Sequence, residues 1–214
     1  MPDLESSRAS IYETFEQVYA LALEVFRHAK NWSTNDNSPP IPEIQELERQ
    51  QEVRKRELEN SIVDALVNYM WGPSDVRRFV AILRSTANLE RIAENSIQIV
   101  LAIRDNAAVA SDIRSNPDLR TLWDQVEELL EDAVLIFLRE QEEKIPALQR
   151  LEEQIDQTYR RLTNHTLHEL EHNPSPQAIR AGFLLMNLVR RLERIADHGS
   201  NMVENYLSIV KEEA

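Results

Sequence analysis

Only three glycines, Gly72, Gly182 and Gly199, occur in the 214 residues of this chain. Proteins built from sheets need many tight turns, and phosphate-binding loops need several glycines close together. Neither demand can be met here, and residues that favour helices dominate the rest of the sequence. The sequence therefore predicts an all-α protein.

Nine prolines divide the chain into long intervals without proline. A helix interior excludes proline, whereas the first turn of a helix tolerates it. The segment STNDNSPPIP is typical of a loop, and AAVASDIRSNPD is expected to join two halves of the chain. These boundaries predict six helices, at residues 8–32, 43–70, 74–106, 117–143, 146–172 and 177–212.

The last predicted helix carries an apolar stripe whose members are three and four residues apart, which is typical of a helix packed nearly parallel to its neighbours. The stripe consists of Leu185, Leu188, Leu192, Ile195, Gly199, Met202, Tyr206 and Ile209. The motif LERIA occurs at residues 89–93 and again at 192–196, an offset of 103, and the preceding helices match at an offset of 104. The sequence therefore predicts two tandem three-helix bundles, at residues 1–110 and 111–214.

Composition excludes several classes of protein. The chain has no cysteine, so it can form neither disulfides nor thiolate metal sites. Its formal net charge of −13 disfavours binding to nucleic acid and to anionic membrane surfaces. No apolar run approaches the ~20 residues that span a bilayer, and the N-terminus lacks the pattern of a signal peptide. We expect a cytoplasmic protein without membrane insertion.

Pairs of carboxylates four residues apart occur in both halves. Glu193 and Asp197 share one face of the last predicted helix, because residues i and i+4 are neighbours. Counting back through the turn near Pro174 places Glu152 and Asp156 at the same height on the preceding helix. The first half repeats this pattern with Glu48 and Glu52 opposite Glu90 and Glu94. The sequence therefore predicts two clusters of four carboxylates.

Clusters of oxygen ligands suit hard cations such as Mg²⁺, Mn²⁺ or Ca²⁺, with iron or Zn²⁺ as further candidates. Close like charges repel unless a cation or an arginine lies between them. The alternative interpretation is that these acids form the solvated faces of surface helices, where basic residues such as Arg54, Lys55, Arg56 and Arg194 neutralise them.

The motifs LERIAE and LERIADH, together with ERQQEV and EEQIDQTY on the partner helices and PSDVRRFV before the first of them, resemble those of the PhoU family over nearly the whole chain. The resemblance implies a cytoplasmic negative regulator of phosphate uptake and phosphate-starvation signalling. Such a protein is an adaptor rather than an enzyme, often a dimer, between the ATPase subunit of the phosphate ABC transporter and a sensor histidine kinase. The implied metal ligands are Glu48, Glu52, Glu90, Glu94, Glu152, Asp156, Glu193 and Asp197.

Two alternatives remain open, a di-metal (di-iron) helical enzyme and a helical scaffold without metal. Di-iron bundles use Glu-x-x-His, whereas His198 follows Glu193 by five residues. We expect His165, His168 and His172 to be solvated near a helix end, and His198 to lie at a boundary between helices.

Overall fold

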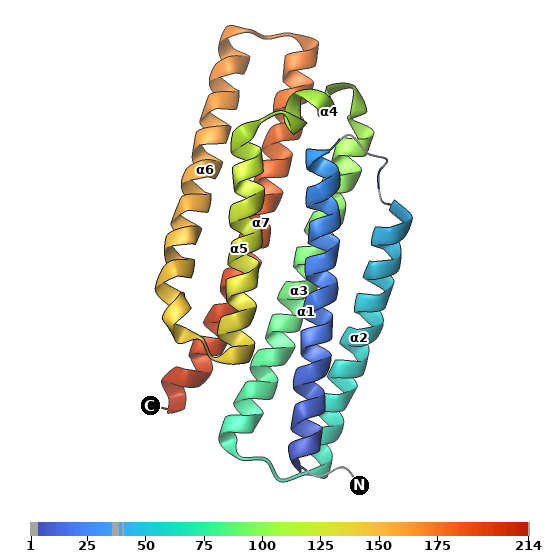
Figure 1. Ribbon diagram of the computed structural model, residues 1–214, viewed down its shortest axis with the longest axis vertical. Coiled ribbons are helices and arrows are strands. Elements are labelled where there is room, and N and C mark those ends of the chain that lie inside the picture. The colour runs from blue at the N-terminus through green and yellow to red at the C-terminus, as the bar shows by residue number, and fades with distance from the viewer. Residues whose placement is uncertain (1–3, 36–38, 40, 214) are drawn as a thin grey trace.

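The computed structural model describes residues 4–35, 39 and 41–213. Within these residues the fold consists of seven α-helices and one 3₁₀ turn, without strands, which confirms the predicted all-α class. All of these helices except the eight-residue α4 run along the long axis of the molecule (Figure 1). The elements are α1 (Leu4–Thr34), α2 (Ile41–Asn68), α3 (Pro73–Asp105), α4 (Ala107–Arg114), α5 (Pro117–Arg139), η1 (Glu142–Lys144), α6 (Ile145–His172) and α7 (Pro176–Glu213).

The six long helices begin and end within four residues of the predicted positions. Five of them, α2, α3, α5, α6 and α7, have a proline at their first or second position. The predicted loop STNDNSPPIP separates α1 from α2, although its residues 36–38 and 40 lie outside the described residues.

The end of α5 was predicted wrongly. The helix stops at Arg139 rather than at residue 143, because Glu140 adopts the left-handed conformation (φ 53°) and its backbone N–H donates to the carbonyl of Leu135. Glycine is the usual residue at such a position, so a glutamate there gave no signal in the sequence. The turn η1 then leads directly into α6.

The joint between the halves is itself a helix. Residues Val109, Ala110 and Ile113 of α4 are buried, so this short helix covers one end of the core instead of forming a loop. The side chain of Asn116 then accepts a hydrogen bond from the backbone N–H of Leu119 (3.1 Å) and caps α5. The boundary predicted between residues 110 and 111 falls within α4.

The helices form two three-helix bundles, as predicted. Helices α1, α2 and α3 pack together in the first half, and α5, α6 and α7 in the second, while α3 packs against α7 along the middle of the molecule. The α2–α3 and α6–α7 turns lie at opposite ends (Figure 1). Buried side chains from both halves form one continuous hydrophobic core. The stripe predicted for α7 is buried from Leu188 to Ile209, and Leu185 packs at its edge.

Polar contacts also join the halves. Tyr19 on α1 donates to the carbonyl of Leu130 on α5 (3.2 Å), and Asn205 on α7 donates to the hydroxyl of Ser85 on α3 (3.2 Å). Gly199 allows α7 to approach α5 closely, because a Cβ atom there would lie 2.6 Å from Leu129 Cδ2.

No helix among the described residues has the length and apolar character needed to cross a membrane.

Candidate metal-binding clusters

The predicted carboxylates all lie at the edge of the core on the α2–α3 and α6–α7 hairpins. Each one follows a buried residue by a single position: Leu47, Gln51, Leu89, Ala93, Leu151, Ile155, Leu192 and Ala196 precede them. A helix that buries one position turns the next by about 100°, so each carboxylate emerges beside the seam rather than inside it. The sequence interpretation placed these side chains correctly relative to the core.

The four carboxylates of the first half line one small pocket of about 80 Å³. Lys55 shares this pocket, and its Nζ lies 2.5 Å from Oε2 of Glu90. The side chains of Glu52 and Glu94 pair with Arg56 and Arg91, respectively. Basic side chains of the same hairpin therefore already neutralise three of the four acids in this cluster.

The floor of the first pocket is polar. Gln51 is buried, and its Nε2 donates to the backbone carbonyl of Leu89 on α3 (3.1 Å). This amide ties α2 to α3 directly beneath the carboxylates. This buried position holds an amide in the first cluster and an aliphatic side chain in the second. The carboxylates of the two clusters therefore lie beside different buried surroundings.

The carboxylates of the second half lie in one electrostatic neighbourhood. Burial raises the pKa of Glu152, and the charges of Asp197 and Asp156 raise it further. The pKa of Glu193 is raised by burial and then by Asp197 and Asp156, and that of Asp197 by burial and then by Asp156. Asp156 has an ion pair with Arg160 at 3.7 Å. The repulsion identifies a site where a cation would be stabilising.

The two clusters differ because two residues differ. At an offset of 104, Lys55 of the first cluster corresponds to Tyr159, and Gln51 corresponds to the buried Ile155. The second cluster thus lacks the ammonium group that occupies the first. Its positive neighbours include Arg160, which pairs with Asp156, and Arg190 and Arg194. The last two lower the pKa of Glu193, but by less than burial and the two aspartates raise it. The repeated sequence pattern suggested two equivalent sites, but the charged groups around the two clusters differ.

Both clusters open onto a groove between the halves. Glu48 and Glu94 of the first cluster and Asp197 of the second line this groove, whose volume is about 740 Å³. Arg191 lines it as well; its guanidinium hydrogen-bonds to the amides of Asn187 and Asn95, and burial and nearby Arg194 lower its pKa. No pattern in the sequence indicates this groove, because it depends on how α3 and α7 pack.

His198 lies at the boundary between α7 and α3, as predicted. Its Nδ1 is 3.1 Å from Oδ1 of Asn88, so the ring donates to that amide oxygen and holds the two halves together. Burial lowers the pKa of His198. A histidine held in this way across the seam differs from the Glu-x-x-His ligand of a di-iron bundle, so the geometry does not support the di-metal enzyme.

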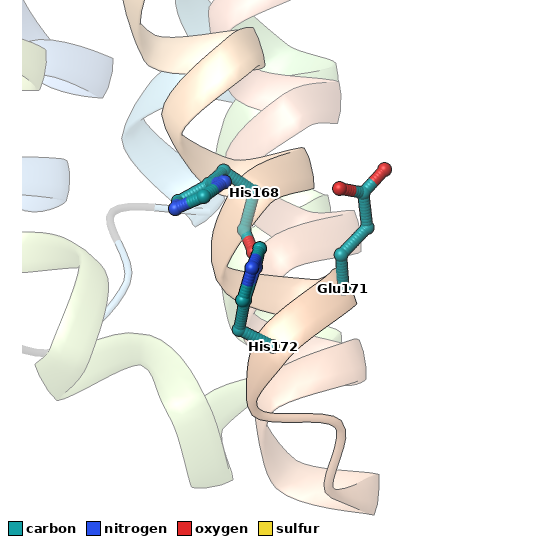
Figure 2. A group of neighbouring side chains, drawn as sticks. All are labelled: His168, Glu171 and His172. Carbon is teal, nitrogen blue, oxygen red and sulfur yellow. The ribbon is translucent and has the colours of Figure 1, made fainter.

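One other group has metal-binding geometry. Among the described residues, only His168, Glu171 and His172 bring three ligand atoms within 4.8 Å of one another, and all three side chains are exposed near the end of α6 (Figure 2). Neither carboxylate cluster meets that distance. The histidines near the end of α6 are exposed to solvent, as predicted. Two of them, His168 and His172, also form a compact group with Glu171.

Known proteins resemble this chain in sequence and in fold. Residues 119–206 match the model of the PhoU domain. The crystal structure of PhoU from Pseudomonas aeruginosa superposes with a TM-score of 0.84 and 18% identity, over 98% of this chain and 100% of that one. A PhoU domain therefore occupies residues 119–206 of this chain. The phosphate transport system regulatory protein PhoU from Streptococcus pneumoniae has a TM-score of 0.79 and 19% identity, with 98% of each chain covered.

Three PhoU relatives share the name "Phosphate-specific transport system accessory protein PhoU homolog". The protein from Pseudomonas putida is 23% identical over 79% of this chain, and the match spans 65% of its own length, just under two thirds. The P. aeruginosa protein is 21% identical, with 79% and 69% covered, and the Deinococcus radiodurans protein is 20% identical, with 89% and 85% covered. These names describe accessory proteins rather than enzymes, in agreement with the prediction that this chain is not an enzyme.

Proposed function

We propose that this chain is an accessory regulator of phosphate uptake that acts in the cytoplasm and represses the phosphate-starvation response. The observation that carries the proposal is the match to PhoU structures over 98% of the chain, with the family domain at residues 119–206. The relatives that are named accessory proteins of a phosphate-specific transport system supply the biological context.

Deletion of the gene tests this regulatory role. In a strain that carries a phosphate-starvation reporter, the deletion is expected to switch the reporter on at high phosphate, and wild-type protein supplied in trans is expected to switch it off. A reporter that responds to phosphate identically with and without the gene would exclude the role.

The proposed partners are the ATPase subunit of a phosphate ABC transporter and a sensor histidine kinase, with the chain as a homodimer between them. Helical bundles with charged outer faces suit such an adaptor, since they offer long rigid surfaces. Affinity capture of the tagged chain from cells grown in high phosphate is expected to recover both proteins. Light scattering of the purified chain gives the mass of the assembly, and a monomer would exclude the dimer.

We further propose that a hard divalent cation or iron binds at the carboxylate clusters, with the second cluster as the stronger site. Support comes from the repulsion between Asp156 and each of Glu152, Glu193 and Asp197, which a cation would relieve. The first cluster is the weaker candidate, because Lys55 would have to leave Glu90 before a metal could enter.

Metal analysis and thermal melting test the cluster sites. Mn²⁺ and Mg²⁺ are expected to raise the melting temperature of protein stripped with EDTA, and the shift is expected to disappear in a variant with Asp156→Asn and Asp197→Asn. The titrations should use the His168→Ala, His172→Ala background so that nitrogen ligands do not compete. Absence of bound metal and of any shift with Mg²⁺, Mn²⁺, Zn²⁺ or iron would exclude these sites.

A further inference from the structure

We propose that His168, Glu171 and His172 form a second kind of metal site, selective for Zn²⁺ and similar transition metals. The site lies on the outer face of α6 near its C-terminal end (Figure 2). It is separate from the carboxylate clusters in position and in ligand chemistry, and it does not depend on the proposed regulatory function.

The geometry of the two histidines is that of a helical chelate. His168 and His172 are four residues apart, so they share one face of the helix, and their ring centroids are 4.1 Å apart. The ligand atoms of the three side chains lie within 4.8 Å of one another. Zn–N bonds of about 2.0–2.1 Å require these atoms to move inward by roughly 1 Å, which exposed side chains can do by small rotations.

A hydrogen bond prepares one ring for the metal. Nδ1 of His172 lies 2.8 Å from the backbone carbonyl of His168. A carbonyl only accepts, so Nδ1 carries the proton, and the Nε2 lone pair is left free to bind. This contact matches the outer-shell bond that fixes the tautomer and orientation of metal-binding histidines. The ring is therefore oriented before the metal arrives.

The surroundings favour a cation. The group lies in the last two turns of α6, where the helix dipole presents its negative end. None of the three side chains is held in an ion pair within the described part of the chain, so binding need not break one. Two imidazoles and one carboxylate suit Zn²⁺, Ni²⁺, Co²⁺ or Cu²⁺, whereas Mg²⁺ and Ca²⁺ prefer oxygen alone.

The order of the residues points to the same metal. His168, Glu171 and His172 read His-x-x-Glu-His, which is the order used by inverted zinc proteases for two zinc ligands and an adjacent glutamate. Here all three side chains are exposed, so the site offers a substrate no enclosure. Three protein ligands leave a tetrahedral metal with one open position, available to water or to a ligand from another protein. The site thus suits metal binding rather than hydrolysis.

Calorimetric titration of the full EDTA-treated chain with Zn²⁺ tests the site. In the Asp156→Asn, Asp197→Asn background, where the second carboxylate cluster does not compete, one equivalent is expected to bind. Removing one arm of the chelate in His168→Ala or His172→Ala is expected to weaken this binding by about a hundredfold. Glu171→Gln, which removes the third ligand, is expected to weaken it by about tenfold. His28→Ala is the matched control, because His28 sits four residues from Glu24 on α1 without a second histidine and should leave binding unchanged.

Spectroscopy and selectivity complete the test. Co²⁺ is expected to give a visible absorption band in the wild-type chain that both histidine variants lose, and Mg²⁺ at equal concentration should not displace Zn²⁺. Equal Zn²⁺ affinity in wild type and in any one of the three site variants, with melting curves unchanged, would overturn the three-ligand site. Since the readout is zinc binding by purified protein, its failure would leave the phosphate reporter result intact.

Discussion

Neutralising Asp197 should stabilise the protein. In the folded state this carboxylate faces three others, because Asp197 contributes to the raised pKa of Glu152 and Glu193 and is itself affected by Asp156. Asparagine keeps the shape of the side chain and removes its charge. We therefore predict that Asp197→Asn raises the free energy of unfolding in the absence of metal, contrary to the usual effect of substitutions at a structured site.

The magnitude follows from counting pairs. A like-charge pair four residues apart on a helix costs about 0.2–0.5 kcal/mol, and partly exposed pairs between helices are of similar size. Removing three such pairs stabilises the protein by roughly 0.6–1.5 kcal/mol. The variant also loses the attraction between Asp197 and Arg194, which costs about 0.2–0.5 kcal/mol. The net gain is about 0.5–1 kcal/mol, which raises the melting temperature by about 1–4 °C in a chain of this size.

The dependence on pH has a definite sign. Burial and neighbouring carboxylates raise the pKa of Glu152, Glu193 and Asp197 in the folded state, so the folded state binds protons more tightly than the unfolded chain. The penalty from their charges is complete at neutral pH, declines as the pH falls through the raised pKa values, and is absent below the unfolded values near about 4. The advantage of Asp197→Asn should shrink accordingly.

Thermal melting of EDTA-treated wild type and Asp197→Asn at low salt measures this difference. Adding 1 M salt should reduce it, since the screening length falls to about 3 Å. A cation bound by the cluster should reverse the order of stability, because only the wild type gains from the metal. An Asp197→Asn variant that is less stable than wild type at low salt, or a difference insensitive to both salt and pH, would refute the repulsion.

Other predictions follow from contacts near the clusters. Glu90→Gln should lower the free energy of unfolding by up to about 1 kcal/mol, because it removes the 2.5 Å ion pair with Lys55. This effect is opposite in sign to that of Asp197→Asn. Chemical denaturation measures it, and a gain in stability would count against a neutralised first cluster. Gly199→Val should destabilise the protein by about 1–3 kcal/mol, because a Cβ atom at this position would lie 2.6 Å from Leu129 and 3.0 Å from Leu130. An unchanged denaturation midpoint would show that α5 and α7 separate without cost.

The long helices could be predicted because proline and glycine mark them directly. Pro73, Pro117 and Pro176 stand at helix starts, and the spacing of apolar residues gave the buried stripe of α7. Two features had no such mark. Glu140 ends α5 in a conformation that glycine normally adopts, and α4 is a helix too short to show a clear period.

The candidate site was predictable in position but not in charge. Counting residues about the turns placed the acids at matched heights, since antiparallel helices pair at equal distances from their turn. Which acids meet a base depends on single side chains: Lys55 reaches Glu90 across the first hairpin, whereas the corresponding Tyr159 has no charge. The groove that joins Glu94 to Asp197 depends on the packing of α3 on α7, which no local pattern encodes.

A reporter assay with cluster variants would connect the second cluster to regulation most directly. A deletion strain would carry either the wild-type gene or one with Glu152→Gln, Asp156→Asn, Glu193→Gln and Asp197→Asn, after melting has shown that the variant is folded and at least as stable. At high phosphate the wild type should repress the phosphate-starvation reporter, and the neutralised variant should leave it on. Full repression by the neutralised variant would contradict a functional role for the charged cluster.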